Sequence, residues 1–293
     1  MLSTATNIEK YWQLATGNWR LYNEWMNALA DFMDHYGIPP GGSPRQRLDR
    51  VAAAFAGLPY ENITKIIKHE ESGSSRQARR YPEEVIRDHI RWGAGGTCFS
   101  LTSALLHLVR SLGWKAEYIL ADRRYGQNTH CALIVWIDSL PHLLDPGFLV
   151  VRPIPLPSEG AREMETQFNR LVLVPGETPG RISLHTVRQN KKVYRLTYRT
   201  SPVDDGEFGR AWDASFYWDM MKYPLLTRAV ESKQIYLKGS RMQISGAGTA
   251  EKQNIHMDEL TEKISSAFRI HPSLIARAVS ILKDRGDFAS SKG

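Results

Sequence analysis

The chain has 293 residues, of which 42% are hydrophobic and 10% aromatic, so we expect it to fold around a large core. Its longest apolar run, residues 131–137, is too short to cross a bilayer, and the first residues lack the basic start and apolar core of a secretion signal. The net charge is +7, but the basic residues are scattered along the chain and form no basic helix, and the aromatic and glycine pattern of an RNA-binding sheet is missing. We therefore expect neither a membrane nor a nucleic acid as a partner.

Residues 1–112 are expected to be mainly helical, because their apolar residues recur at helical spacing. A first helix is predicted within residues 23–37. A second begins near Ser43, which can cap it, with Pro44 at its first position. The segment "YPEEVIRDHIRWG" predicts a third, since a proline followed by two acids suits a helix N-terminus. Between the last two, the polar residues 69–80 are expected to form a mobile loop.

The segment "GTCFSLTSALLHLVRSLGW" places Cys98 where a glycine-rich loop becomes a helix. Leucines at helical spacing follow the cysteine as far as Gly113. A thiol at a helix N-terminus can have its pKa lowered from about 8.5 to roughly 3.5–7.5, which makes it a nucleophile at neutral pH. A lone cysteine on an amphipathic helix is commonly a small packing residue, so the position by itself leaves both interpretations open.

After Gly113 the hydrophobic pattern changes to that of strands. Strands are predicted in "WKAEYILA", "HCALIVWI" and "HLLDPGFLVV", with a turn at residues 138–141 between the last two. Residues 149–181 are expected to be loops and short strands, and "ISLHTV" and "VYRLTYRT" predict another hairpin. Together these segments predict a small antiparallel sheet or barrel.

Two residues of this predicted sheet can complement the thiol. His130 begins the strand "HCALIVWI", and an antiparallel return brings Asp145 within about two residues of the position opposite it. Such a carboxylate could fix the tautomer of the imidazole and stabilise its charged form. Cys98, His130 and Asp145 are therefore a candidate nucleophile, base and orienting group, although each type of residue also has a common structural role in such positions.

The rest of the chain returns to mixed structure. Residues 211–230 form an aromatic, helix-like stretch, and the hairpin "QIYLKGSRMQIS" follows. Two helices complete the chain, of which the clearer begins at Pro272 and ends at Gly286.

The cysteines and histidines also bear on compartment and cofactors. Two cysteines are too few for a disulfide framework, so we expect a cytoplasmic protein. No Cys-x-x-Cys or His-Glu-x-x-His spacing predicts a metal site.

Several motifs resemble those of the arylamine N-acetyltransferase family. "GGTCFSL" is similar to that family's Arg-Gly-Gly-x-Cys-Phe-Glu nucleophile motif, and "LPYENI" to its Pro-Phe-Glu-Asn segment. "THCALIV" and "HLLDPGF" resemble its histidine strand and its Asp-Val-Gly-Phe strand. Weaker similarity continues through "RPIPLP", "YWDMMKYPLLTRAV" and "QIYLKGSRMQI", so much of the chain takes part.

The resemblance implies a site and a fold. Cys98 would be the acyl-accepting nucleophile, His130 its base and Asp145 the orienting acid; Gly147 would lie near the acyl donor and Phe148 in the wall of the acceptor pocket. The implied architecture is α+β: a helical bundle over residues 1–112, an antiparallel β-barrel over 113–210, and an interdomain helix with an α/β lid over 211–293. The donor would be acetyl-CoA or another acyl-CoA, used as a co-substrate with no tightly bound cofactor.

Three departures from the family pattern matter. Ala94 stands where the motif has arginine, and Ser100 where it has glutamate. Both family residues are charged groups that support the active-site loop, so this chain must orient the loop differently. Pro146 follows Asp145, and this Asp-Pro pair resembles the sequence found in the wider transglutaminase-like superfamily of cysteine-triad proteins.

Three functional hypotheses remain open at this point. The first is an N-acyltransferase that carries an acyl group from acyl-CoA to a small-molecule amine through a Cys98 thioester. The second is a transglutaminase-like or amidohydrolase-like enzyme that acts on a peptide amide through the same thioester. The third is a non-catalytic binding module, which the loss of the motif arginine and glutamate would allow.

Overall fold

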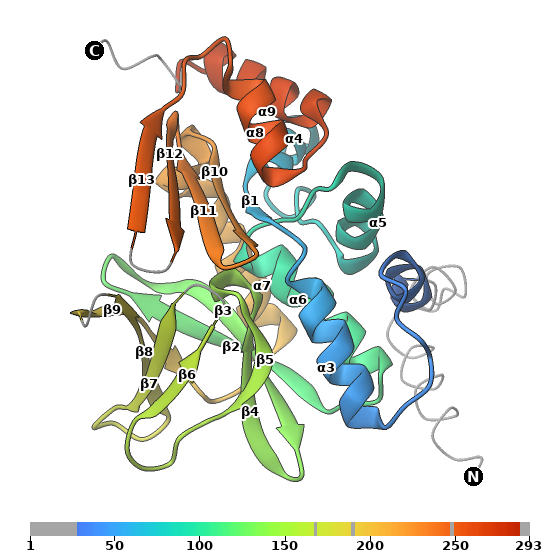
Figure 1. Cartoon of the computed structure of the whole chain (residues 1–293), viewed down its shortest axis with the longest axis vertical. Coiled ribbons are helices and arrows are strands. Elements are labelled where there is room, and N and C mark those ends of the chain that lie inside the picture. The colour runs from blue at the N-terminus through green and yellow to red at the C-terminus, as the bar shows by residue number, and fades with distance from the viewer. Residues whose placement is uncertain (1–27, 167–168, 189–190, 247–248, 288–293) are drawn as a thin grey trace.

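The structure, a computed structural model, describes residues 28–166, 169–188, 191–246 and 249–287. It confirms the predicted α+β fold, in which helices are followed by an eight-stranded antiparallel sheet, a second sheet and two further helices (Figure 1). In this described part of the chain, no helix combines the length and apolar character that a membrane span requires.

From residue 28 to residue 112 the chain is mainly helical, as its hydrophobic spacing predicts. Residues 28–35 form a helix, whereas the start of the segment predicted at 23–37 lies outside the described residues. The hydroxyl of Ser43 accepts a hydrogen bond from the backbone of Gln46, and the Gln46 side chain accepts one from the backbone of Ser43, which confirms the predicted cap. The helices from this cap onward are α3 (Pro44–Phe55), α4 (Ile63–Ser72), α5 (Pro82–Trp92) and α6 (Cys98–Ser111).

The expectation of a loop over residues 69–80 is correct for residues 73–80 and wrong for residues 69–72. Residues 69–72 are the last turn of α4, which the sequence analysis did not identify. At the other end, Arg79 forms an ion pair with Asp213, and the side chain of Arg80 is only 3% exposed. Buried contacts with distant parts of the chain therefore hold a segment whose polar composition is typical of a loop.

The eight-stranded sheet curls into a nearly closed barrel, as predicted (Figure 1). The order of the strands is β5-β4-β3-β2-β9-β8-β7-β6, so β5 and β6 are its two edges. Apolar side chains inside it form a separate core that includes Ile119, Ile134, Leu143, Leu173, Leu184 and Leu196. Its strands are β2 (Ala116–Arg123), β3 (Gly126–Ile137), β4 (Leu140–Asp145), β5 (Val150–Pro155), β6 (Arg162–Glu165), β7 (Arg170–Pro175), β8 (Arg181–Arg188) and β9 (Lys191–Arg199).

A tight turn joins β3 to β4 and sets their register. Asp138 and Ser139 have φ values of 51° and 64°, in the left-handed region that two-residue hairpin turns require. Leu140 pairs with Ile137 and Pro141 with Trp136, so the last two residues of the predicted turn belong to β4. The turn is shorter than expected, and the strand that carries Asp145 begins earlier.

A second sheet has the order β1-β10-β11-β12-β13. The β11–β12 hairpin confirms the one predicted from sequence, and the polar edge strand β13 was not predicted. The strands are β1 (Tyr60–Glu61), β10 (Leu225–Val230), β11 (Lys233–Lys238), β12 (Arg241–Gly246) and β13 (Thr249–Asn254). Since β1 comes from the N-terminal part, this sheet joins segments that are far apart in the sequence.

The helix-like interpretation of residues 211–230 is correct only for its first part. Here α7 (Asp205–Ala214) ends, and two short 3₁₀ turns follow, η2 (Ser215–Tyr217) and η3 (Asp219–Lys222). The last six residues are strand β10, because they pair on one side with β1 and on the other with β11. The two predicted C-terminal helices are present as α8 (Leu260–Phe268) and α9 (Pro272–Asp284).

Helix α6 links the helical part to the barrel. It packs against β2, β3 and the 3₁₀ turn η1 (Pro146–Phe148) that follows β4. Helix α9 in turn packs against α4, so the first and last parts of the chain are in contact (Figure 1). The division of the chain at residues 112 and 210 stays a prediction.

Candidate active site

Cys98 is the first residue of α6, at the end of the helix where backbone N–H groups point outward. Its side chain is 2% exposed. The glycines before it allow a close approach of two backbone segments, since a Cβ on Gly95 would lie 1.8 Å from the carbonyl oxygen of Pro59. The loop thus runs against the segment that precedes β1 and delivers the thiol to the interior at the positive end of α6.

The barrel places His130 and Asp145 beside each other. Leu133 pairs with Leu144, so Asp145 lies two residues along its strand from the position opposite His130. This agrees with the spacing expected from the sequence. The two side chains are fully buried, and 2.7 Å separates Nε2 of His130 from Oδ2 of Asp145. The carboxylate therefore fixes the orientation of the imidazole.

Asp145 is itself held by two further hydrogen bonds. The hydroxyl of Tyr198, on β9, donates to Oδ2 at 2.6 Å, and the backbone N–H of Phe148 donates to Oδ1 at 3.0 Å. Tyr198 was not identified from the sequence, where it is one aromatic residue in an alternating strand. The pairing of β9 with β2, two strands far apart in the sequence, brings this tyrosine to the carboxylate.

The surroundings of the Cys98 thiol favour its charged form. A hydrogen bond from Cys131 is the largest influence that holds the pKa of Cys98 well below its usual range; burial opposes it, and the hydrogen bond and charge of His130 reinforce it. Burial lowers the pKa of His130, but the charge and hydrogen bond of Asp145 outweigh this, so that pKa is raised. A lowered thiol pKa beside a raised imidazole pKa is the signature of a thiolate–imidazolium pair.

Arg123 is a second residue that the sequence analysis missed. Its Nη2 donates to Nδ1 of His130 at 3.1 Å, and its Nη1 donates to the hydroxyl of Tyr125 at 2.6 Å. Because arginine cannot accept, Nδ1 is the acceptor while this bond is present, and the ring is then neutral with its proton on Nε2; an imidazolium forms only when the bond from Arg123 is broken. The guanidinium also lowers the pKa of Cys98. Its neighbour Arg124 lies over Tyr194 instead, and nothing in the sequence distinguishes the two arginines.

Gly147 and Phe148, expected at the substrate site, lie against these residues. A Cβ on Gly147 would come within 2.7 Å of Cε1 of His130 and 3.3 Å of Cβ of Cys98. The ring centre of Phe148 lies 5.1 Å from that of His130, edge to face, and 5.6 Å from the guanidinium carbon of Arg123. A side chain at position 147 would therefore press on both His130 and Cys98, so only glycine fits there.

In the folded protein, iodoacetamide should alkylate Cys98 at a rate that is already near its maximum at about pH 7.5, because the thiolate is the reacting species. Cys131 should react slowly, and its rate should still rise above about pH 9, since burial raises its pKa. Peptide mass spectrometry over a pH series measures both rates. Equal labelling of the two cysteines would contradict the assignment of Cys98 as the reactive thiol.

The same measurement tests Arg123. Arg123→Gln should shift the alkylation profile of Cys98 to higher pH, because the neutral amide removes a cation that favours the thiolate. Arg124→Gln is the matched control, since that side chain is directed at Tyr194, and it should leave the profile unchanged. An unshifted profile in Arg123→Gln would show that this guanidinium does not act on the thiol.

Within the described residues, no cluster of three histidine, cysteine, aspartate or glutamate side chains is placed to hold a metal ion.

Comparison of the sequence with protein families matches residues 47–275 to a family described as N-acetyltransferase. Comparison with curated proteins gives no match.

Solved structures of arylamine N-acetyltransferases have the same fold. The enzyme from Mycobacterium abscessus superposes with a TM-score of 0.75 at 17% identity, over 88% of this chain and 97% of that one. The enzyme from Mycobacterium marinum gives 0.73 at 16% identity, over 88% and 98%. A structure of the M. marinum enzyme in complex with CoA gives 0.70 at 15% identity, again over 88% and 98%.

Proposed function

The chain belongs to the arylamine N-acetyltransferase family, and on this basis we propose that it is an acyl-CoA-dependent N-acyltransferase that works by ping-pong chemistry. Its donor is acetyl-CoA or another acyl-CoA, and its acceptor is a small-molecule amine. The complex of the M. marinum relative with CoA supports this choice of donor, and the net charge of +7 suits the phosphates of CoA. Acyl-CoA is a co-substrate, and the proposal includes no tightly bound cofactor.

One observation carries the proposal: Cys98, at the N-terminus of α6, and the buried pair formed by His130 and Asp145 all lie against the same residue, Gly147. This arrangement supplies a nucleophile with a lowered pKa, a base next to it and an acid that orients the base. Cys98, His130 and Asp145 are thus proposed as the catalytic triad.

In the first half-reaction, the Cys98 thiolate attacks the carbonyl carbon of the acyl-CoA thioester. A new S–C bond forms, and the bond from the carbonyl carbon to the CoA sulfur breaks. The imidazolium of His130 gives its proton to the departing thiolate, so free CoA leaves and the ring becomes neutral. Backbone N–H groups in the first turn of α6 are suited to stabilise the negative charge that develops on the carbonyl oxygen.

In the second half-reaction, the amine attacks the thioester on Cys98. Neutral His130 takes the proton from the attacking nitrogen, the S–C bond breaks, and the Cys98 thiolate returns beside the imidazolium. Asp145 stabilises the positive charge on the ring in both half-reactions. Gly147 and Phe148 are proposed to line the substrate space, with Gly147 near the acyl donor and the Phe148 ring in the wall that faces the amine.

A burst experiment tests the proposal. When the protein is mixed with acetyl-CoA or longer acyl-CoAs and no amine, its intact mass should rise by one acyl group, and one equivalent of CoA should be released rapidly. Peptide mapping should place the adduct on Cys98, and an arylamine or hydrazine should discharge it. The acyl-CoA that gives the fastest burst identifies the donor class.

Two other results would replace the proposal. An adduct that forms with a glutamine-containing peptide but with none of the acyl-CoAs would favour a transglutaminase-like enzyme. An absence of any adduct, with Cys98 unreactive toward iodoacetamide, would favour a binding module.

A further inference from the structure

The loop before Cys98 contains no charged side chain, since residues 93–100 are all neutral. Its backbone is nevertheless firmly held. The N–H of Gly96 donates to the carbonyl of Pro59 at 3.3 Å, and the N–H of Glu61 donates to the carbonyl of Gly96 at 2.9 Å. These bonds make a parallel bridge between the loop and β1. The carbonyl oxygen of Gly95 takes no part in this bridge and accepts a hydrogen bond from a side chain instead.

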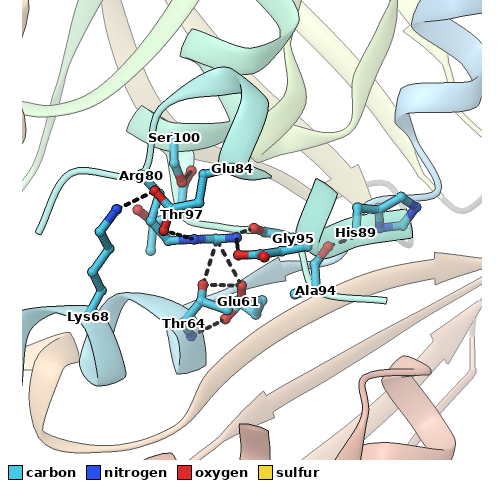
Figure 2. Close-up of polar contacts among 11 residues, drawn as sticks. Glu61, Thr64, Lys68, Arg80, Glu84, His89, Ala94, Gly95, Thr97 and Ser100 are labelled. Atoms are coloured by element: carbon cyan, nitrogen blue, oxygen red, sulfur yellow. Dashed lines mark hydrogen bonds and ion pairs between the residues drawn. The ribbon is translucent and has the colours of Figure 1, made fainter. Parts of the chain in front are cut away.

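That partner is Arg80, whose side chain is 3% exposed. Its Nη1 donates to the carbonyl oxygen of Gly95 and to the hydroxyl of Thr64, both at 2.6 Å, while Nη2 donates to Oδ2 of Asp88 at 2.7 Å. Figure 2 shows the guanidinium between the loop that carries Gly95 and the helix that carries Thr64. One planar group thus joins the loop before Cys98 to α4 and α5.

The charge of Arg80 is balanced at the same place. The carboxylate of Glu61, which is fully buried, lies 3.7 Å from Nη1, and that of Glu84 lies 3.8 Å from Nε (Figure 2). Glu61 also accepts hydrogen bonds from the backbone N–H and the hydroxyl of Thr64. Lys68 in turn forms an ion pair with Glu84. A buried cation is tolerated only with such partners, so the whole cluster fixes the position of the guanidinium.

We propose that Arg80 is a positioning residue for the nucleophile: its guanidinium fixes the carbonyl of Gly95 and thereby the first turn of α6, where Cys98 lies. Arg80 supplies a charged contact to a loop that has alanine at position 94 and serine at position 100. The inference rests on the proposed function, because it assigns a residue that aims Cys98. Its measurable consequence is a change in the pH dependence of Cys98 alkylation.

The geometry of the cluster predicts which substitution is informative. Arg80→Lys keeps the positive charge beside Glu61 but replaces the planar guanidinium, with its two terminal nitrogens, by an ammonium group with one nitrogen. An ammonium there cannot reach Gly95, Thr64 and Asp88 as the two terminal nitrogens of the fork do. The protein should therefore fold, while the carbonyl of Gly95 loses its donor.

Arg79 supplies a matched control on the adjacent residue. It forms a two-pronged ion pair with Asp213 at 2.7 Å and donates to the carbonyl of Gly209 at 2.9 Å, so it too is a fork bound to a carboxylate and a carbonyl. These partners lie on α7 and do not include the loop before Cys98. Arg79→Lys should lower thermal stability in the same way as Arg80→Lys without affecting the thiol.

The experiment compares both variants with the parent protein by the pH profile of Cys98 alkylation and by steady-state acyl transfer. For Arg80→Lys we expect an alkylation profile shifted to higher pH, a kcat at least tenfold lower, and an amine KM within about threefold of the parent value. For Arg79→Lys we expect an unshifted profile and a kcat within about twofold. If Arg80→Lys does not fold, Thr64→Val is used instead, since it removes one of the acceptors that hold the guanidinium in place, and a smaller shift in the same direction is expected.

Two results would overturn the inference: an unchanged thiol profile with parental kcat in Arg80→Lys, or an equal loss in Arg79→Lys. Its failure can be told apart from a failure of the proposed function. If Cys98→Ala retained acyl transfer, the nucleophile would be wrong, whereas the effect of Arg80 on Cys98 alkylation is measured without any acyl-CoA.

Discussion

Cys98→Ala is expected to abolish acyl transfer, with kcat reduced by about 10⁴-fold or more, because no covalent acyl-enzyme can form. The burst of free CoA and the mass adduct should disappear together with turnover. Cysteine and alanine are both small, and the substitution changes only the first residue of α6, so the fold should be retained. Circular dichroism and thermal unfolding check this before kinetics are measured.

Ser103→Ala is a suitable control for this substitution. It removes a small, buried polar group from the same helix, one that accepts a hydrogen bond from the hydroxyl of Tyr118 rather than facing His130. Its acyl transfer should stay within about twofold of the parent. Substantial turnover in Cys98→Ala would mean that acyl transfer proceeds without the thioester.

Asp145→Asn should lower kcat by about 10³- to 10⁴-fold while the protein stays folded. The reason lies in the hydrogen bonds of the carboxylate, whose Oδ2 accepts from both His130 and Tyr198 while Oδ1 accepts from the N–H of Phe148. An amide has one NH₂ group, and either orientation places it against a donor. If it faces the imidazole, it selects the tautomer whose proton is on Nδ1, and that tautomer cannot act as the base.

The same substitution should change the thiol. The charge of Asp145 raises the pKa of His130, so its removal lowers that pKa, leaves less imidazolium at neutral pH and shifts the alkylation of Cys98 to higher pH. Tyr198→Phe, which removes one hydrogen bond to the carboxylate, should give a smaller loss of about tenfold. Rates and the alkylation profile are measured on the same preparations.

His142→Gln is the control for Asp145→Asn. His142 lies three residues earlier on the same strand, and its Nδ1 is bonded to the carbonyl of Leu140 rather than to a group at the site. The kcat of the His142→Gln variant should be close to that of the parent protein. If Asp145→Asn also retained near-parental rates, Asp145 would be a residue of a turn and the proposed triad would be incorrect.

Much of the local structure could be predicted because it depends on neighbours in sequence. The capping box of Ser43 and Gln46 begins α3 as expected, and Pro272 begins α9. The short turn at Asp138 and Ser139 let the approach of Asp145 to His130 be predicted to within two residues. In each case the determining interaction spans only a few residues, so its signal is present in the local pattern.

Other local patterns were misleading because tertiary contacts outweighed them. Residues 225–230 follow a helical stretch, yet they form β10, because β1 pairs with them on one side and β11 on the other. The polar segment 69–80 has the composition of a loop, yet its end is held by ion pairs to distant carboxylates. Hydrogen bonds and buried charges need partners, and packing decides where those partners are.

The sequence by itself determined the α+β class, the start of a helix at Cys98 and the strands that carry His130 and Asp145. Only the tertiary structure decided which groups surround them: Tyr198 on the carboxylate, Arg123 on the imidazole and Arg80 on the loop. A tyrosine or an arginine has the same local pattern whether it faces solvent or a buried site. Its role is set by the electrostatic partners that a nearly closed barrel and packed helices bring within hydrogen-bond distance, and those partners are far away in the sequence.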